Sequence, residues 1–252
     1  MQVFSHSKLI DGKRDGSKLL IDHLSGVNDK ALSHISANVK FGNSEAATKV
    51  LNVICWLHDL GKYTSYFQTY LLEPEKAQQD LKAHSNLGAH TAFQYFKESP
   101  EIVLLAFFLI KMHHSNLVNI DLVLFPDNAS VRIHEPEIFQ KQRDALGDLE
   151  ELVNRLEAFS HSLIELSTPK HLYALYRKHL RKQASIERYY FTNYLFSLLI
   201  EADKLDASDT LPYLPKDLPE RAVDDRFGKP LYPRVDLHRM SQNELRNYVR
   251  SE

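Results

Sequence analysis

A histidine and an aspartate stand side by side where a long apolar stretch ends, and this pair limits what the chain can fold into. Apolar side chains recur at helical spacing over residues 45–60, and His58 falls seven positions after Leu51, on the side that a helix would bury. Gly61 predicts the end of that helix. Because an uncompensated buried carboxylate costs several kcal/mol, we expect Asp59 to be ion-paired, hydrogen-bonded or bound to a metal.

Further histidines and aspartates occur at the ends or on the inner faces of other predicted helices. They are His23, His84, His113, His114 and Asp203. Taken singly, His23 or His84 is also explained as an ordinary hydrogen-bonded histidine. Asp203 has the alternative of pairing with Lys204, and Asp206 in the same Asp-Lys-Leu-Asp run competes with it. His90 is six positions from His84 and would lie on a different helical face.

The order of these residues resembles the ligand order of the HD metallohydrolase superfamily, which runs His, His-Asp, His, His-His and Asp. Over residues 1–210 the fuller wording resembles the HD nuclease domain of the type I CRISPR helicase-nuclease. The matching motifs are Ser5-His6-Ser7, His58-Asp59-Leu60-Gly61-Lys62, His84-Ser85-Asn86-Leu87-Gly88-Ala89, His113-His114-Ser115-Asn116-Leu117 and Ala202-Asp203-Lys204-Leu205-Asp206-Ala207.

This resemblance implies an all-α fold, an HD-domain helical bundle with a metal site at its centre. It places the nuclease core at residues 1–210, and residues 211–252 form a proline-rich segment and a final helix that packs on the core or leads out of it. It also implies two ions that share Asp59 as a bridging ligand. The first would be held by His23, His58, Asp59 and Asp203, and the second by His84, His113 and His114 together with Asp59. His6 would form hydrogen bonds at the edge of the site.

The ligand types indicate which metals and which chemistry to expect. Cys55 is the only cysteine, so a disulfide framework and a cysteine-bound zinc site are both excluded. Mixed imidazole and carboxylate ligands suit one or two ions of manganese, iron, cobalt or nickel at least as well as zinc, with magnesium as a further candidate. Two neighbouring ions suit phosphodiester hydrolysis, in which we expect Asp59 and Lys62 to be catalytic. Lys62 would contact a phosphate oxygen or, alternatively, form a salt bridge with Asp59.

Composition adds information about partners and compartment. The chain has 252 residues and a formal net charge of −2, so it has no global basic field, and any nucleic acid must bind a local patch or the metals. Residues 170–182 interleave basic and aromatic side chains, as single-strand binding surfaces do, although a solvated helix face has the same pattern. No signal pattern is visible, and the longest apolar run, residues 102–110, is far shorter than the ~20 residues that span a bilayer. We therefore expect a soluble cytoplasmic protein without a membrane partner.

Apolar periodicity predicts an almost entirely helical chain. The run at residues 102–110 is apolar on every face, so its helix should cross the middle of the domain and deliver the His113-His114 doublet from its end. We predict loops at residues 126–130 and 209–235, the latter containing half of the ten prolines. The predicted helices cover residues 17–27, 30–40, 45–60, 64–72, 86–97, 101–112, 135–160, 170–182, 186–206 and 237–250.

By resemblance, the chain is expected to be a metal-dependent DNA nuclease of type I CRISPR interference that prefers single-stranded DNA. Its partners would be an ATP-driven CRISPR helicase and the RNA-guided surveillance complex. The chain lacks a Gly-x-x-x-x-Gly-Lys-Ser/Thr motif, so it would be a separate nuclease subunit or one piece of a longer helicase-nuclease. Two alternatives remain open: an HD-type nucleotide or cyclic-nucleotide phosphohydrolase, and an inactive metal-binding interaction module.

Overall fold

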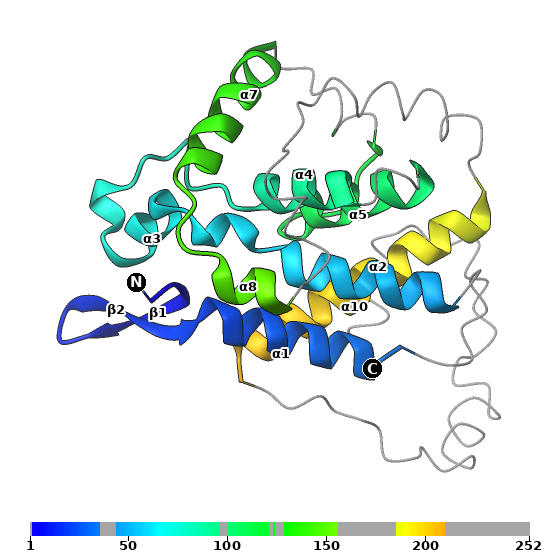
Figure 1. The fold of residues 1–252 in the computed structure, drawn as a ribbon, viewed down its shortest axis with the longest axis horizontal. Helices are drawn as coiled ribbons and strands as arrows, with labels where there is room; N and C mark the ends of the chain where they lie inside the picture. Colours follow the sequence, from blue (N-terminus) through cyan, green and yellow to red (C-terminus); the bar gives the residue numbers. More distant parts are fainter. Residues whose placement is uncertain are drawn as a thin grey trace, which may run out of the picture. The chain divides into compact units, whose positions relative to one another are not determined.

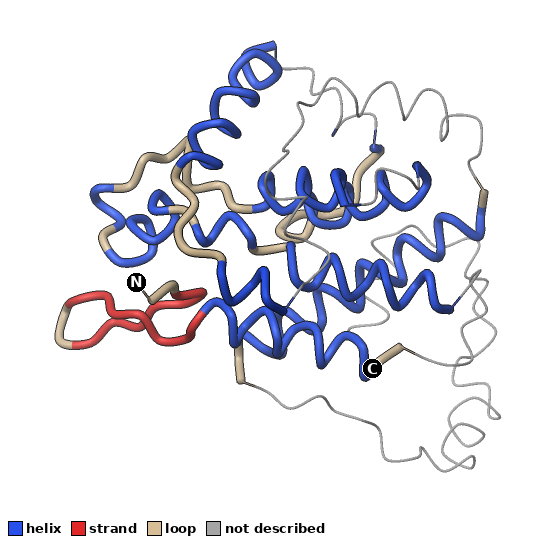
Figure 2. Tube along the Cα trace, in the orientation of Figure 1, coloured by secondary structure: helices blue, strands red, loops and turns tan. Residues whose placement is uncertain are grey.

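The computed structural model describes residues 2–35, 44–95, 100–120, 123, 129–155 and 185–209. Within these ranges the chain is mostly helical and contains one small two-stranded sheet (Figures 1 and 2). The expectation of a helical protein is therefore correct, whereas the expectation of a chain without strands is wrong.

The sheet is an antiparallel hairpin of β1 (Phe4–Ile10) and β2 (Lys13–Leu19). Asp11 and Gly12 connect the strands with φ angles of 49° and 78°. Positive φ at both central residues is the geometry of the tight hairpin turns that Asp-Gly favours, so the sequence did carry this signal. The predicted helix at residues 17–27 begins too early, because residues 17–19 belong to β2.

Helix α1 (Leu20–Ser33) is continuous, and the predicted break between residues 27 and 30 is wrong. Asn28, which lies within the predicted break, is buried and accepts a hydrogen bond of 3.0 Å from the side-chain amide of Asn52. Asn52 belongs to α2 (Ser44–Leu57), so the Asn28 side chain links α1 to α2. Residues 36–40 of the predicted second helix lie outside the described residues.

The central predicted helix ends earlier than expected. Helix α2 stops at Leu57, and a short 3-10 helix, η1 (Leu60–Tyr63), follows the His58-Asp59 turn. Gly61 therefore lies inside η1 and does not terminate α2. A Cβ at Gly61 would lie only 2.3 Å from the backbone oxygen of His84, so glycine is required there by close packing.

The following helices agree well with the sequence pattern. Thr64 caps α3 (Ser65–Leu72) by accepting a hydrogen bond of 3.2 Å from the Phe67 amide. A 3-10 turn, η2 (Pro74–Lys76), follows. Helices α4 (Ser85–Tyr95) and α5 (Pro100–Met112) pack against each other, and α5 is buried along its apolar run, as predicted.

The later part of the described chain contains α7 (Ala129–Asp144), α8 (Glu150–Arg155) and α10 (Ile186–Ala207). The single helix predicted at residues 135–160 is wrong, because the chain turns around Gly147, whose amide donates to the Tyr63 carbonyl at 2.9 Å. The loop predicted at residues 126–130 overlaps the start of α7. The prediction for residues 186–206 matches α10 to within one residue. The helices predicted at 170–182 and 237–250, the proline-rich residues and the boundary at 210 lie outside the described residues.

Helix α2 is the element around which the others pack. It contacts α1, α4, α5 and α10, and its buried side chains join the same apolar core as theirs. Helix α4 packs closely against the C-terminal end of α2, since a Cβ at Gly88 would lie 1.8 Å from the Leu57 carbonyl oxygen. As a result of this packing, His58 and Asp59, which follow α2, are buried. No described helix is long and apolar enough to cross a membrane.

Candidate metal centre

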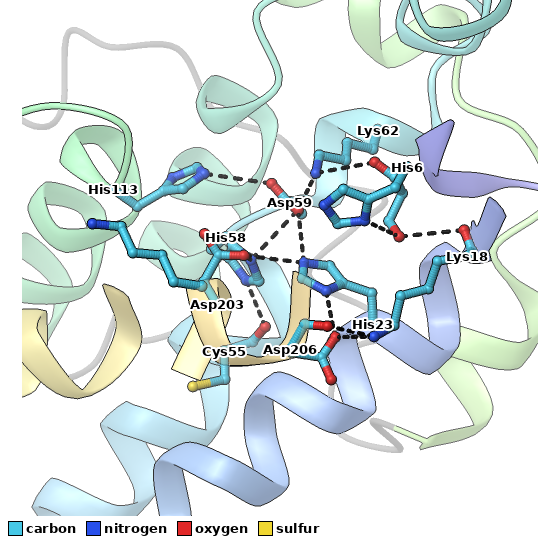
Figure 3. A network of polar contacts seen from close by, with 12 residues as sticks. His6, Lys18, His23, Cys55, His58, Asp59, Lys62, His113, Asp203 and Asp206 are labelled. Carbon is cyan, nitrogen blue, oxygen red and sulfur yellow. Dashed lines mark hydrogen bonds and ion pairs between the residues drawn. The ribbon is translucent and has the colours of Figure 1, made fainter. Parts of the chain in front are cut away.

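The structure brings all of the predicted ligands together at the end of α2. His23 comes from α1, and Asp203 comes from the last turns of α10. His58 and Asp59 lie in the turn that follows α2, and the remaining histidines lie at two other helix ends. His84 directly precedes α4, and His113 and His114 directly follow α5. Figure 3 shows the side chains of His23, His58, Asp59, His113 and Asp203 pointing toward one another.

The ligands form two groups that share Asp59. In each group the candidate ligand atoms all lie within 4.8 Å of one another. The inner group is His23, His58, Asp59 and Asp203, and the outer group is Asp59, His84, His113 and His114. This is the division that the HD resemblance implies.

The two carboxylate oxygens of Asp59 face different groups. Oδ2 lies 3.3 Å from His23 Nε2 and 3.5 Å from His58 Nε2. Oδ1 lies 3.2 Å from His84 Nε2 and 3.4 Å from His113 Nε2. With 1% of its surface exposed, Asp59 is placed as a carboxylate that bridges two cations would be.

Several buried atoms in these groups have no hydrogen-bond partner among the described residues: His23 Nε2, His58 Nε2, His113 Nε2 and Asp59 Oδ1. The contacts of His23 Nε2 with Asp59 and Asp203 have ion-pair distances but not hydrogen-bond angles. Leaving a buried polar atom unpaired costs about 1–3 kcal/mol. Four such atoms in one place therefore need an explanation. One metal ion in each group would satisfy these atoms by accepting their lone pairs.

In two of these histidines, the hydrogen bond made by Nδ1 determines that Nε2 is the nitrogen available to a metal. His58 Nδ1 donates to the Cys55 carbonyl oxygen at 2.8 Å, and His113 Nδ1 donates to the Ile110 carbonyl oxygen at 2.7 Å. Each carbonyl selects the tautomer that carries its proton on Nδ1 and leaves a bare lone pair on Nε2. These residues therefore fit a divalent metal.

The charges of the inner group depend on one another. Burial lowers the pKa of His23, but its contacts with Asp203, Asp206 and Asp59 outweigh burial and raise the pKa to about 10. Burial raises the pKa of Asp59, but the electrostatic effect of the neighbouring His58 and Lys62 and the contacts with the other histidines hold it well below its usual range. Since metal ligands must be deprotonated, an ion that binds here would displace a proton from His23.

The outer group is the more accessible one. His114 is exposed, and the His84 side chain is 14% exposed, whereas His23 and His58 are fully buried. The Nε2 atoms of His84 and His114 lie 2.5 Å apart. Partial desolvation by the surrounding side chains, together with the neighbouring His113 and His84, lowers the pKa of His114 to about 3, so its ring is neutral and can donate a lone pair to a metal. The outer group is therefore the side of the centre that faces solvent.

Lys62 forms the salt bridge with Asp59 that was one of its two interpretations. Its Nζ lies 2.6 Å from Asp59 Oδ2 and donates to the Ser5 carbonyl at 3.4 Å. The side chain is buried, so its charge balances the carboxylate directly. Contact between Lys62 and a phosphate stays a prediction.

Two other buried or half-buried histidines, His6 and His90, are not members of either ligand group. His6 lies at the edge, where its Nδ1 hydrogen-bonds with Ser5 Oγ at 2.9 Å and its ring packs 5.2 Å from that of His23. His90 is buried against Phe107 and Phe139 and belongs to neither group.

The sequence pattern missed the residues that support the ligands. Asp206 accepts a hydrogen bond of 2.7 Å from His23 Nδ1, and its place one turn after Asp203 was the available signal. Gln142 of α7 donates to the carbonyls of Leu81 and Ala83, just before His84. Nothing in the sequence marks this glutamine.

Comparisons with protein-family models, curated proteins and solved structures each found no match to this chain.

Proposed function

We propose that this chain is an HD-type, metal-dependent phosphodiesterase that hydrolyses DNA and prefers single strands. One observation carries the proposal: imidazoles and carboxylates from distant helices converge in two groups around one shared buried carboxylate. Their order along the chain is the order on which the HD resemblance rests. A fold that needed only a hydrogen-bonded core would not leave the ligand atoms of three buried histidines unpaired.

In this proposal, the role of each residue depends on the ligand group to which it belongs. The inner group would hold one ion and the outer group a second, from manganese, iron, cobalt, nickel, zinc or magnesium. When bound, the ions lower the pKa of water and stabilise negative charge on a phosphate. Asp59 holds the two groups in register, and Lys62 keeps Asp59 ionised. The accessible side at His84 and His114 would receive the scissile phosphate.

The preference for single strands and the partners follow from the narrower resemblance. We propose that an ATP-driven helicase supplies the single strand and that an RNA-guided complex recruits both, as in type I CRISPR interference. With a net charge of −2, the chain would hold DNA through the ions and a local patch, not through a broad basic surface.

The test is cleavage of circular single-stranded DNA by the purified protein with Mn²⁺, Co²⁺, Ni²⁺ or Mg²⁺. Cleavage should require one of these ions and should stop in EDTA. Asp59→Ala should reduce the rate by several orders of magnitude and remove both ions, because it serves both groups. His34→Ala, outside both groups, is the control and should behave like wild type.

Other outcomes identify the alternatives. Hydrolysis of nucleotides or cyclic nucleotides, with circular DNA left intact, would assign the centre to a phosphohydrolase. Bound metal without any turnover would indicate an interaction module. Undiminished DNA cleavage in EDTA, or by Asp59→Ala, would refute the proposed centre.

A further inference from the structure

Asp206 lies behind the metal centre, on the far side of a ligand. It stands one turn after Asp203 on α10 and is 3% exposed. Its Oδ2 accepts a hydrogen bond of 2.7 Å from His23 Nδ1, while His23 Nε2 faces Asp203 and Asp59 at 3.2 and 3.3 Å (Figure 3). The two nitrogens of one imidazole therefore join Asp206 to the ligand groups.

Two lysines hold the Asp206 carboxylate in place. Lys18 Nζ lies 2.9 Å from Oδ2, and Lys30 Nζ lies 2.8 Å from Oδ1. Lys18 also donates to the Asp206 backbone carbonyl at 2.6 Å. Because two ammonium groups balance its charge and fix its orientation, Asp206 stays on the Nδ1 side of His23 and leaves ligation to Asp203.

The space for this carboxylate is built into α1. A Cβ at Gly26 would lie 2.1 Å from Asp206 Oδ1 and 2.8 Å from its Cγ. Any larger residue at position 26 would push Asp206 away from His23. The contact thus depends on a glycine one turn beyond the histidine that Asp206 orients.

We propose that Asp206 is a positioning residue for the inner metal site, which fixes the Nδ1-protonated tautomer of His23 and strengthens its Nε2 as a ligand. The inference rests on the metal centre of the proposed function. The other two fully buried ligands, His58 and His113, donate Nδ1 to neutral carbonyls. A carboxylate acceptor makes an imidazole a stronger donor than a carbonyl does, so the inner ion would be bound more tightly than the outer one.

Mn²⁺ binding tests the proposal, measured by the electron paramagnetic resonance signal of free Mn²⁺. Asp206→Ala should weaken one of two sites by about 10- to 100-fold and leave the other unchanged. Asp206→Asn should lose less, because the amide oxygen still accepts from Nδ1 but carries no charge. The matched control is Asp209→Asn, which removes the other carboxylate near Lys18, 79% exposed and 2.9 Å away, and should leave both affinities unchanged.

A second measurement reads the tautomer of His23 in the metal-loaded protein. In the Zn²⁺-loaded wild type with ¹⁵N-labelled histidine, the His23 signal, assigned by its loss in His23→Gln, should show a proton on Nδ1 and metal on Nε2. Asp206→Asn should shift that Nδ1 resonance, whereas Asp209→Asn should not. This readout reports the tautomer itself and stays decisive if Asp206→Ala does not fold.

The outcomes separate the two proposals. Wild-type Mn²⁺ affinity in both Asp206 variants, or metal on Nδ1 of His23, would overturn the role of Asp206 and leave the metal centre standing. Loss of one site in Asp206→Ala without any DNA cleavage by wild type would support Asp206 and refute the nuclease. If wild type bound neither Mn²⁺ nor Zn²⁺, both proposals would fall.

Discussion

At the scale of single residues, the candidate metal centre combines the ligands with Asp206, which hydrogen-bonds one of them. Motif order selects His58, Asp59 and their partners because each ligand has a fixed chemical role and a recognisable local wording. Asp206 acts through its distance to His23, which lies far away in the chain. Only the packing of α1 on α10 brings the two together, so the local signal, a second aspartate one turn after Asp203, does not reveal that His23 is its partner.

His90 leads to a prediction about pH at the scale of one residue. Burial, together with the nearby charge of Lys111, lowers the pKa of His90 from its ordinary value of 6.5 to about 3. Between these values the unfolded chain binds a proton that the folded chain does not. The contribution of His90 to the free energy of unfolding should therefore fall as the pH drops, by about 1 kcal/mol between pH 6.5 and pH 5.5.

Urea unfolding at pH 7 and pH 5.5 checks this prediction. His90→Leu has no titrating group at this position, so its loss of stability between the two pH values should be smaller than that of wild type. His34→Leu should keep the wild-type difference. Equal differences in wild type and His90→Leu would show that His90 is not the acid-sensitive group.

At the scale of elements, the sequence predicts what apolar periodicity determines and misses what tertiary contacts determine. The runs that became α5 and α10 are long and strongly apolar, and their bounds were predicted closely. The hairpin has mostly exposed, polar strands, so it lacks the alternation by which strands are recognised. The continuity of α1 through Asn28 depends on a partner in α2, which periodicity cannot supply.

Helix α7 supports the outer ligand group through one side chain. Gln142 Nε2 donates to the Leu81 and Ala83 carbonyls at 2.9 and 2.5 Å and so holds the residues before His84. Gln142→Leu leaves both carbonyls without this donor, at a cost of about 1–3 kcal/mol in unfolding free energy. We also expect weaker Mn²⁺ binding at the outer site only.

Gln140→Leu is the matched control for this change. Gln140 lies on the same helix but bonds only to the exposed Asp144, at 2.8 Å, among the described residues. Thermal unfolding and Mn²⁺ titration of both variants provide the comparison. If the two variants lost the same stability and the outer site stayed intact in both, Gln142 would have no special role.

At the scale of the whole molecule, metal binding should stabilise the fold by mass action, because the ligands converge only in the folded chain. At a free Mn²⁺ concentration one hundred times the dissociation constant, one site contributes about 2.7 kcal/mol, or roughly 5–11 °C in melting temperature. EDTA should reverse the increase, and Asp59→Ala should show none. Calorimetry across a Mn²⁺ series is the measurement, and a melting temperature independent of Mn²⁺ would contradict a folded-state site.

Because the ligands come from separate helices, metal binding should also affect how fast the protein unfolds. His23 and Asp203 lie near opposite ends of the described chain, so the inner group is complete only when α1 and α10 have docked. Because the entropy of closing the long loop between such segments must be overcome before they make contact, we expect this docking to come late in folding. An ion held by them would stabilise the native state more than the transition state, and would lengthen the lifetime of the folded protein without making it fold faster.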